Sequence, residues 1–361
     1  MLKTICGTAV ASGAFVGSSA AQDAVVSPGE SIQDAIDGAS PDDTIVVESG
    51  TYKEDVTIDV EGVTLEGPNA GVAGDEGSRD DEATIDGQVV LSEDGTALDG
   101  FEVSPPSAES TQGSEAIRIG NTPADVIVEN NVVRDFERDD PNGEFYGVDG
   151  INVFGGVADD PIEDATVRRN EVRNLRNEDQ AGAAGISIQG NVEGATVEDN
   201  VVTEVGEEVT AYGFGVVIRG TGNHDEVPED VEVVGNDLTD VLSDPDSEFD
   251  GVGFEVEADG EGYTVTENRI EGNNLGVEIK VAAAETEIDF NDIEDNTRRG
   301  IFNDDDATLD ATDNWWGHAS GPGGPDGRRN PAGKEVGKGD EIEGSVEFDP
   351  WLRRSIDSPS R

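Results

Sequence analysis

The stretch Gly185-Ile-Ser-Ile188, followed by Val197-Glu-Asp-Asn200-Val-Val202, contains both short segments that the rest of the chain repeats. Both are rich in Val and Ile and alternate apolar with polar positions, a pattern typical of short β-strands. Copies of the second segment, apolar-x-x-Asn-x-apolar, contain Asn131, Asn170, Asn200, Asn236, Asn268, Asn291 and Asn314. Copies of the first, Gly-apolar-x-apolar, alternate with them and begin at Ala116, Gly150, Gly185, Gly215, Gly253, Gly276 and Gly300.

The spacing of these repeats predicts a solenoid of stacked strands. Successive Asn residues are 39, 30, 36, 32, 23 and 23 positions apart. The shortest interval suffices for one coil of two or three short strands, whereas helical repeats need about 33 residues or more. We therefore predict an all-β fold, a single right-handed parallel β-helix. The longer intervals are expected to hold loops at 135–146, 174–182, 203–212 and 240–250.

The two ends of the predicted solenoid have signals of their own. Residues 30–38 predict a short helix with Ser31 as its N-cap, which would cover the first coil. A Trp-containing segment at 312–352 is expected to close the other end, ahead of a polar tail at 353–361. Residues 1–21 resemble a signal peptide, which predicts that the solenoid at 22–352 is exported to the cell surface or beyond.

The composition is extremely acidic, with 82 Asp and Glu against 22 Lys and Arg and a formal net charge of -60. Such a surface holds water and counterions, and molar salt screens its self-repulsion, so the chain resembles proteins of extreme halophilic archaea. No basic patch is available for nucleic acid. No stretch approaches the ~20 apolar residues of a membrane span. We expect a monomer.

Family resemblance appears at both ends of the chain. Ser31-Ile-Gln-Asp-Ala-Ile36 and Val63-Thr-Leu-Glu-Gly67 resemble the first coils of pectin-esterase and pectate-lyase type β-helices. The later repeats resemble those of NosD-like surface proteins, and Asn314-Trp-Trp-Gly317 resembles the closing segment of many secreted members. The resemblance covers about residues 25–352. It implies a pectin-lyase-like fold but no single activity, because this superfamily includes lyases, hydrolases, epimerases, esterases and non-enzymes.

Stacking of the coils should turn equivalent positions of the Gly-apolar-x-apolar strands into columns on an exposed outer face. The first column contains Arg118, Asn152, Ser187, Val217, Glu255, Glu278 and Phe302. The second contains Gly120, Phe154, Gln189, Arg219, Glu257, Lys280 and Asp304. In an acidic chain these positions can equally be a solvated surface without a function.

Two functions remain open for this face. The first is a surface module that binds extracellular, acidic polysaccharide. Its substrate-binding candidates are Arg118, Asn152, Gln189, Glu257 and Asp149. The alternative is a lyase acting on uronate-containing glycans, in which Lys280 or Arg219 removes a proton and Glu255 and Glu278 assist. A lyase requires these four side chains to converge in a groove walled by the 203–212 and 240–250 loops.

Calcium is the one cofactor we consider, because Asp139-Asp140 and Asp304-Asp-Asp306 offer clustered oxygen ligands. His224 and His318 are too far apart in the repeat register to share a metal. We interpret the Asn column as structural for two reasons. Asn tolerates the left-handed backbone of a tight turn, and stacked amides can hydrogen-bond along the solenoid axis.

Overall fold

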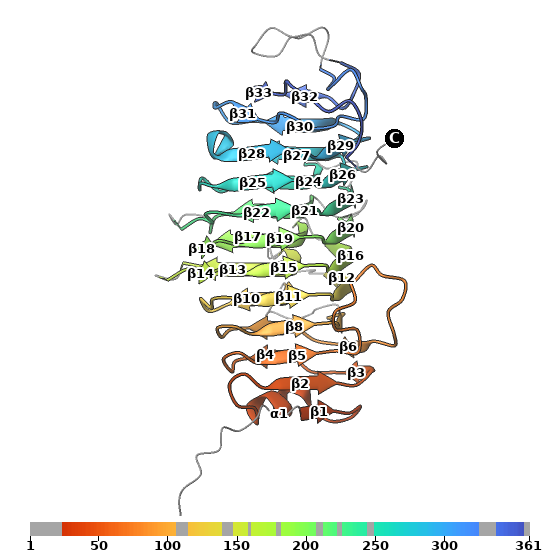
Figure 1. The fold of residues 1–361 in the computed structure, drawn as a ribbon, viewed down its shortest axis with the longest axis vertical. Helices are drawn as coiled ribbons and strands as arrows, with labels where there is room; N and C mark the ends of the chain where they lie inside the picture. Colours follow the sequence, from red (N-terminus) through yellow and green to blue (C-terminus); the bar gives the residue numbers. More distant parts are fainter. Residues whose placement is uncertain are drawn as a thin grey trace, which may run out of the picture.

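The structure is a computed structural model that describes residues 24–105, 115–138, 147–157, 160–177, 182–206, 212–221, 226–243, 249–324 and 337–356. The predicted signal peptide, Asp139-Asp140 and His224 lie outside the described residues. Short parallel strands stack one coil above another into three long sheets, as Figure 1 shows. The predicted parallel β-helix is therefore confirmed.

The three sheets contain twelve, nine and ten strands, and each full coil visits them in that order. The twelve-stranded sheet consists of β1 Ala24–Val26, β2 Thr44–Val47, β5 Thr64–Glu66, β8 Ala97–Asp99, β11 Ile127–Glu129, β15 Thr166–Arg168, β19 Thr196–Glu198, β22 Glu232–Val234, β25 Tyr263–Thr266, β28 Thr286–Asp289, β31 Leu309–Asp310 and β33 Val346–Glu347. The nine-stranded sheet consists of β3 Gly50–Tyr52, β6 Ala83–Ile85, β9 Glu102–Val103, β12 Val132–Arg138, β16 Glu171–Asn177, β20 Val201–Val205, β23 Asp237–Val241, β26 Arg269–Glu271 and β29 Asp292–Glu294. The ten-stranded sheet consists of β4 Val56–Ile58, β7 Val89–Leu91, β10 Glu115–Gly120, β13 Val148–Gly156, β17 Ala183–Gly190, β21 Gly213–Arg219, β24 Gly251–Val256, β27 Leu275–Ile279, β30 Arg299–Asn303 and β32 Ile342–Glu343. Strands β14 Ile162–Glu163 and β18 Val192–Glu193 pair separately.

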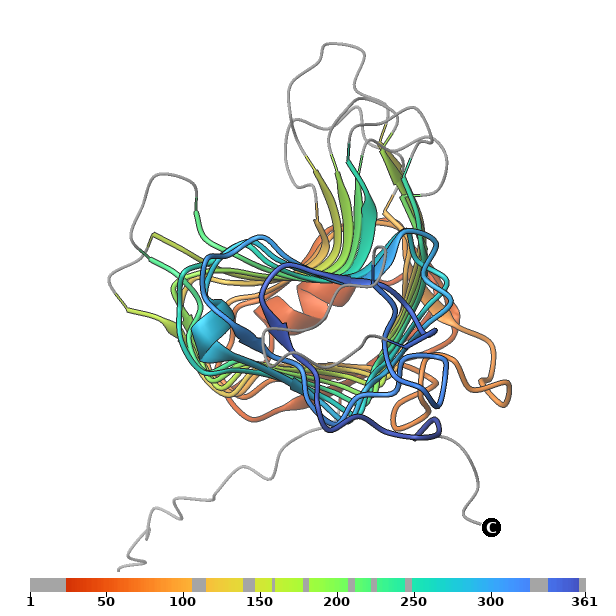
Figure 2. The ribbon, with the colours of Figure 1, turned by 90° about the horizontal axis from the view of Figure 1, so that it is seen from above.

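The core is one continuous apolar column. The three sheets enclose it, and Figure 2 shows these sheets from above. In each coil the alternating apolar residues of the three strands point inward. Val197, Val202 and Ile188, for example, are fully buried on three different sheets. Because equivalent residues stack from coil to coil, every coil buries apolar surface against its two neighbours, and the core grows along the axis.

An asparagine ladder runs through the turn between the twelve- and nine-stranded sheets. The backbone N–H of Asn200 donates to Asn236 Oδ1 at 3.0 Å, and Asn200 Nδ2 donates to the same oxygen at 3.0 Å. Asn200 Nδ2 also donates to the Val167 carbonyl at 2.9 Å. The pattern repeats from Asn131 to Asn314, and all seven side chains are at most 1% exposed. The structural interpretation of this column is confirmed.

One of the two reasons given for that interpretation is wrong. The left-handed backbone of each turn belongs to the residue before the ladder Asn. These residues are Asn130, Arg169, Asp199, Gly235, Glu267, Phe290 and Asp313. The turn therefore places the left-handed residue at the outer corner and sends the following amide inward, where it can stack.

Both ends of the core are covered. Helix α1, Ile32–Asp37, buries Ile32 and Ile36 against the first coils, and Ser31 Oγ accepts a hydrogen bond from the Asp34 N–H at 3.1 Å. At the other end Trp316 and Phe348 are fully buried in the core. Among the described residues, no helix is long and apolar enough to span a membrane.

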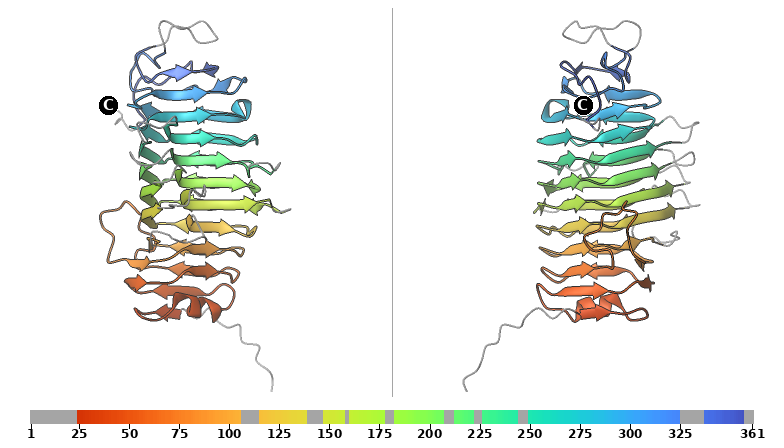
Figure 3. Two further views of the ribbon diagram at one scale, coloured as in Figure 1. Left: turned by 180° about the vertical axis from the view of Figure 1, so that it is seen from behind. Right: turned by 45° about the vertical axis from the view of Figure 1, so that its right-hand side comes forward.

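Two further features shape the outside. The strands β12 and β16 continue to residues 138 and 177, so the first part of two predicted loops, at 135–138 and 174–177, is strand. With their neighbours in the ten-stranded sheet they form a wing past the corner of the coil (Figure 2). A segment at 67–82 packs outside the coils, where Arg79 Nη1 donates to the Asn130 carbonyl at 2.8 Å (Figure 3).

The repeated Gly lies where the nine- and ten-stranded sheets meet. A Cβ on Gly276 would lie 2.5 Å from the Gly300 carbonyl oxygen of the next coil, and one on Gly215 would lie 2.4 Å from that of Gly253. Only Gly lets the backbones approach so closely. The Gly in the repeat therefore marks this corner.

Candidate functional site

The outer face of the ten-stranded sheet has the columns that the repeat predicts. The register pairs Arg118 with Asn152, Asn152 with Ser187 and Ser187 with Val217, and continues through Glu255 and Glu278 to Phe302. Gln189 pairs with Arg219 in the second column. The prediction that this face is exposed is wrong in its middle, because Asn152, Ser187, Val217 and Glu255 are at most 1% exposed. Neighbouring side chains contact several of them: Asp149 pairs with Asn152, Lys280 pairs with Glu255, and Val217 packs in an apolar cluster.

The sequence argument missed a third outward column. It consists of Glu115, Asp149, Ala184, Phe214, Val252, Leu275 and Arg299, which pair in register from coil to coil. Each member precedes the first column by three residues, because the alternation of inward and outward positions is broken at the intervening Gly. Five side chains, Ala184, Phe214, Val217, Val252 and Leu275, form a small apolar cluster outside the main core.

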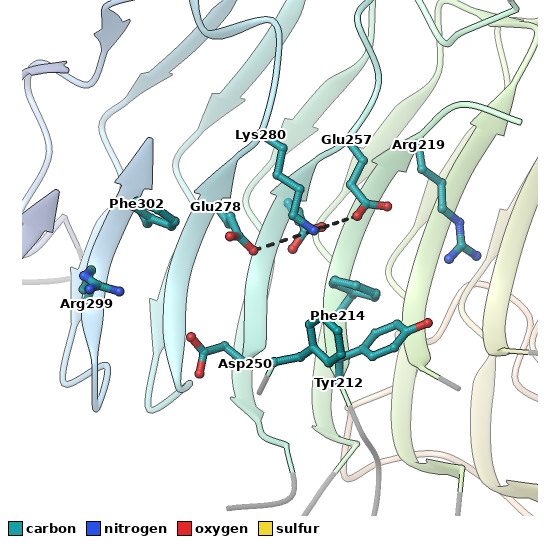
Figure 4. A pocket seen from close by; sticks show the side chains of 11 residues that line it. Tyr212, Phe214, Arg219, Asp250, Glu257, Glu278, Lys280, Arg299 and Phe302 are labelled. Carbon is teal, nitrogen blue, oxygen red and sulfur yellow. Dashed lines mark hydrogen bonds and ion pairs between the residues drawn. The ribbon is translucent and has the colours of Figure 1, made fainter. Parts of the chain in front are cut away.

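The three columns meet in a pocket of about 550 Å³ at the C-terminal half of the sheet, seen in Figure 4. Its lining consists of Tyr212, Phe214, Arg219, Phe249, Asp250, Glu255, Glu257, Glu278, Lys280, Arg299 and Phe302. All four catalytic candidates, and Glu257, are among these residues. Tyr212, Phe249 and Asp250 come from the two loops that were expected to wall a groove.

Lys280 lies at the centre of a carboxyl cluster. Its Nζ atom is 2.7 Å from Glu255 Oε1, 2.7 Å from Glu257 Oε1 and 3.9 Å from Glu278 Oε2. Glu255 and Glu278 pair directly on β24 and β27. Lys280 is 39% exposed, whereas the side chain of Glu255 is only 1% exposed, which excludes a merely solvated role for this carboxyl.

Within the cluster, the pKa values of Glu255 and Glu257 are shifted in opposite directions. Burial, together with hydrogen bonding to Glu257 and Glu278, raises the pKa of Glu255 to about 10. Burial also acts to raise the pKa of Glu257, but hydrogen bonds with Glu255 and Lys280 outweigh burial, and the pKa of Glu257 is lowered. Glu255 is thus a neutral acid at pH 7 beside an ionised Glu257, because three neighbouring carboxyls cannot all carry charge.

Lys280 stays an ammonium ion in this setting. Burial by itself would lower the pKa of Lys280, but its contacts with Glu255 and Glu257 outweigh burial, and the pKa is raised. A general base needs the opposite shift, toward neutral pH. The side chain is therefore held in the form that cannot accept a proton.

Arg219 lies on the same outer face, and its side chain points away from Lys280, as Figure 4 shows. Its Nη2 atom is 2.8 Å from both carboxylate oxygens of Asp149, which lies two coils nearer the N-terminus. Asn152 Nδ2 donates to Asp149 Oδ2 at 2.9 Å. Burial acts to lower the pKa of Arg219, but the Asp149 carboxylate outweighs it and the pKa is raised.

The remaining candidates lie on the same face outside the pocket. Arg118 covers the ring of Phe154, with 4.2 Å from Cζ to the ring centre, and its Nη1 is 3.4 Å from Glu115 Oε1. Gln189 lies on β17 beside Phe154 and Arg219 in its column. Among the substrate-binding candidates, the structure thus brings Glu257 into the pocket and places Arg118, Asn152, Gln189 and Asp149 nearer the N-terminus.

Aromatic side chains form much of the pocket lining. Tyr212 packs against Phe214 and Phe249 with ring centres 5.4 and 5.5 Å apart, and Phe249 is 59% exposed. Four of the eleven lining residues are aromatic, against 5% in the whole chain. Tyr212 and Phe249 stand in loops without repeat character, so no periodic signal could have identified them.

The described residues offer little for a metal. They contain no group of three or more His, Cys, Asp or Glu side chains arranged to hold one. In the Asp304-Asp-Asp306 segment, Asp305 Oδ2 instead accepts a hydrogen bond from the Ala283 N–H at 2.9 Å. His318 Nδ1 is 2.8 Å from Ser320 Oγ. Calcium thus remains a prediction from composition only.

No protein-family model matches the chain, and no curated protein matches it in sequence. Among solved structures it is similar to the pectate lyase Pel9A, with a TM-score of 0.51 and 13% identity over 92% of this chain and 78% of that chain. It is also similar to the A-module of the mannuronan C-5 epimerase AlgE6 from Azotobacter vinelandii, with a TM-score of 0.50 and 17% identity over 88% and 93%. This chain has the right-handed parallel β-helix fold of the pectate-lyase type; at these identities the likeness concerns the fold alone.

Proposed function

We propose that this chain binds polysaccharide along the outer face of the ten-stranded sheet, with the pocket around Lys280 as the principal subsite. The supporting observation is the convergence of one buried carboxyl cluster and four aromatic side chains in the same 550 Å³ pocket. Sugars are commonly held by aromatic faces that stack on the ring and by carboxyls that accept from hydroxyls. The fold neighbours include a pectate lyase and a mannuronan epimerase, which fits a carbohydrate ligand.

Export to the cell surface in a high-salt environment is part of the same proposal. It rests on the signal-like residues 1–21 and on the net charge of -60. An exported solenoid with an elongated outer face can lie along a polymer chain, which passes through the pocket and continues over the neighbouring coils.

Binding is tested by affinity electrophoresis and calorimetry in molar potassium chloride against a panel of neutral, amino and uronate polysaccharides. Phe302→Ala removes an aromatic wall and is expected to weaken the affinity for the bound glycan roughly tenfold. Phe290→Ala is the matched control, because Phe290 is 45% exposed and lies outside the pocket. Absence of binding to every glycan, or equal losses in the two variants, would refute the proposal.

Cleavage of the bound glycan is a second candidate, supported by the separated protonation states of Glu255 and Glu257. A neutral carboxyl beside an ionised one is the usual provision for acid–base chemistry. Glu255 can protonate the leaving glycosidic oxygen while an ionised neighbour takes a proton from water, which gives hydrolysis. Elimination with Lys280 as the base has less support, because the charged ammonium cannot accept a proton.

The two cleavage routes differ in their products. Hydrolysis creates reducing ends alone, whereas elimination also creates an unsaturated sugar that absorbs ultraviolet light. Glu255→Gln keeps the shape but removes the acid, and the expected loss of hydrolysis is at least roughly a hundredfold. Glycan binding without any new reducing end would leave the chain as a binding module.

A further inference from the structure

The cations of the pocket are all matched by carboxylates of the protein itself. Lys280 contacts Glu255 and Glu257, and Arg219 contacts both oxygens of Asp149. Arg299 Nη2 is 2.6 Å from Glu343 Oε2. A uronate carboxylate entering the pocket would therefore have to displace one of these pairs, and it would meet Glu257 and Glu278 as like charges.

The carboxyl cluster, by contrast, is short of hydrogen-bond donors. Glu255, Glu257 and Glu278 bring six oxygen atoms, while the donors of the cluster are the three N–H groups of Lys280 and the O–H of the neutral Glu255. Glu255 Oε2 is buried and accepts no hydrogen bond from any described residue. Glu278 Oε2 is 3.9 Å from Lys280 Nζ, too far for a hydrogen bond. The cluster can thus accept a second ammonium group but not another anion.

The aromatic lining favours the same kind of ligand. The guanidinium of Arg299 already lies 5.2 Å from the ring centre of Phe302, so a cation is accommodated over an aromatic face of this pocket. Tyr212 and Phe249 offer further faces on the opposite wall. Carboxylates surrounded by aromatic faces are a usual environment for bound ammonium groups.

We infer that the pocket recognises a protonated amino group on its glycan, so that the preferred ligand is a polysaccharide of amino sugars rather than of uronates. The inference rests on the proposed function. The ligand ammonium donates to Glu278 and to Glu255, and the proton that Glu255 held leaves to solvent. The amino-bearing ring packs between the aromatic walls.

The test compares oligosaccharides of equal length: glucosamine oligomers, their N-acetylated counterparts and oligogalacturonate, each titrated calorimetrically in molar potassium chloride. Acetylation removes the charge and two of the three N–H donors and adds an acetyl group, so the pair compares an ammonium group with a neutral amide at the same position. We expect the glucosamine oligomer to bind roughly tenfold tighter than the N-acetylated one, as a charged hydrogen bond implies. Oligogalacturonate should bind more weakly than either.

Glu278→Gln removes one acceptor charge with little change in shape and should weaken binding of the glucosamine oligomer roughly tenfold, a larger factor than for the acetylated oligomer. Glu287→Gln is the control, because Glu287 is an exposed carboxyl on β28, outside the pocket. Circular dichroism and melting verify that both variants fold. Tighter or equal binding of the acetylated oligomer or of oligogalacturonate overturns the inference and leaves the proposed function intact. Failure of all three to bind overturns the inference, and the polysaccharide panel then decides the proposed function separately.

Discussion

Two groups of polar side chains run along this solenoid, one inside the coil and one outside it. The inner stack is the Asn ladder, in which each amide oxygen from Asn170 to Asn314 accepts from the preceding Asn, and each Nδ2 from Asn131 to Asn291 donates to the next one. The outer stack is the carboxyl cluster of Glu255, Glu257 and Glu278, in which three carboxyls share one ammonium and Glu255 Oε2 accepts no hydrogen bond from any described residue. Every ladder Asn is buried, whereas in the outer stack only Glu255 is.

The difference lies in hydrogen-bond satisfaction. A stack whose donors and acceptors match is complete in the absence of a ligand and stabilises the fold. A stack with surplus acceptors destabilises the fold when it is buried. Such a stack is typical of a binding site, where a ligand supplies the missing hydrogen-bond donors. Four variants separate the two roles.

The largest effect is expected inside the solenoid. Asn236→Ala leaves the Asn200 N–H and Nδ2 without their acceptor and the Val197 carbonyl without a donor. The expected loss of unfolding free energy is about 3 kcal/mol or more, since each buried orphan costs about 1–3 kcal/mol. Denaturation midpoints measure it, with Glu232→Ala at an exposed position of β22 in the same coil as the control. An unchanged midpoint in Asn236→Ala would contradict the structural role.

The next effect concerns the cation of the outer stack. Lys280→Gln leaves three carboxyls without their ammonium and is expected to cost about 1–2 kcal/mol, a value reduced by solvent because Lys280 is 39% exposed. Lys53→Gln is the matched control: its ion pair with Asp86 spans 3.0 Å, but Lys53 is 77% exposed, and about 0.5 kcal/mol or less is expected. Equal losses of thermal stability in the two variants would place Lys280 among ordinary surface cations.

The pH dependence of stability tests the neutral carboxyl. The pKa of Glu255 is raised from 4.5 to about 10, so between these values the folded state holds a proton that the unfolded state has lost. Stability contributed by Glu255 is therefore fully present below pH 4.5 and declines as pH rises toward 10, by roughly 1 kcal/mol per pH unit at most. Glu255→Gln lacks this slope. Melting temperatures of the two proteins from pH 5 to 9 should converge or cross, and parallel curves would show an ionised Glu255.

The smallest effect is expected at Asp340, the carboxyl that accepts hydrogen bonds from Asn296. Asn296 N–H and Nδ2 both donate to Asp340 Oδ2 at 2.9 Å, and burial raises the pKa of Asp340 to about 6. The raised pKa means that stability falls as pH rises toward 6, because ionisation is disfavoured in the folded state. Asp340→Asn keeps an acceptor without the charge and should stabilise the protein by up to about 1 kcal/mol at pH 8. A melting temperature that is lower at pH 8 but unchanged at pH 4 would instead show that the ionised carboxylate is needed.

The columns could be predicted from the sequence because they depend only on alternation and stacking. Pairs such as Glu255 with Glu278 follow directly from the repeat. The pairing of Arg219 with Asp149 could not be predicted for two reasons. The two residues are two coils apart, and Asp149 belongs to the third column, on the N-terminal side of the repeated Gly. Side-chain reach and local breaks in alternation are invisible to a periodic pattern.

The sequence by itself determined the parallel β-helix, its capping helix, the Asn ladder and the rows on which Lys280 and its carboxyls lie. These are short-range consequences of strand periodicity and of equal spacing between coils. Only the tertiary structure decided that the middle of the outer face is buried and that Tyr212 and Phe249 wall a pocket there. It also decided that Glu255 is neutral while Lys280 stays charged. Burial and charge coupling depend on which loops and side chains meet in space, and loops of irregular length carry no period from which that meeting could be inferred.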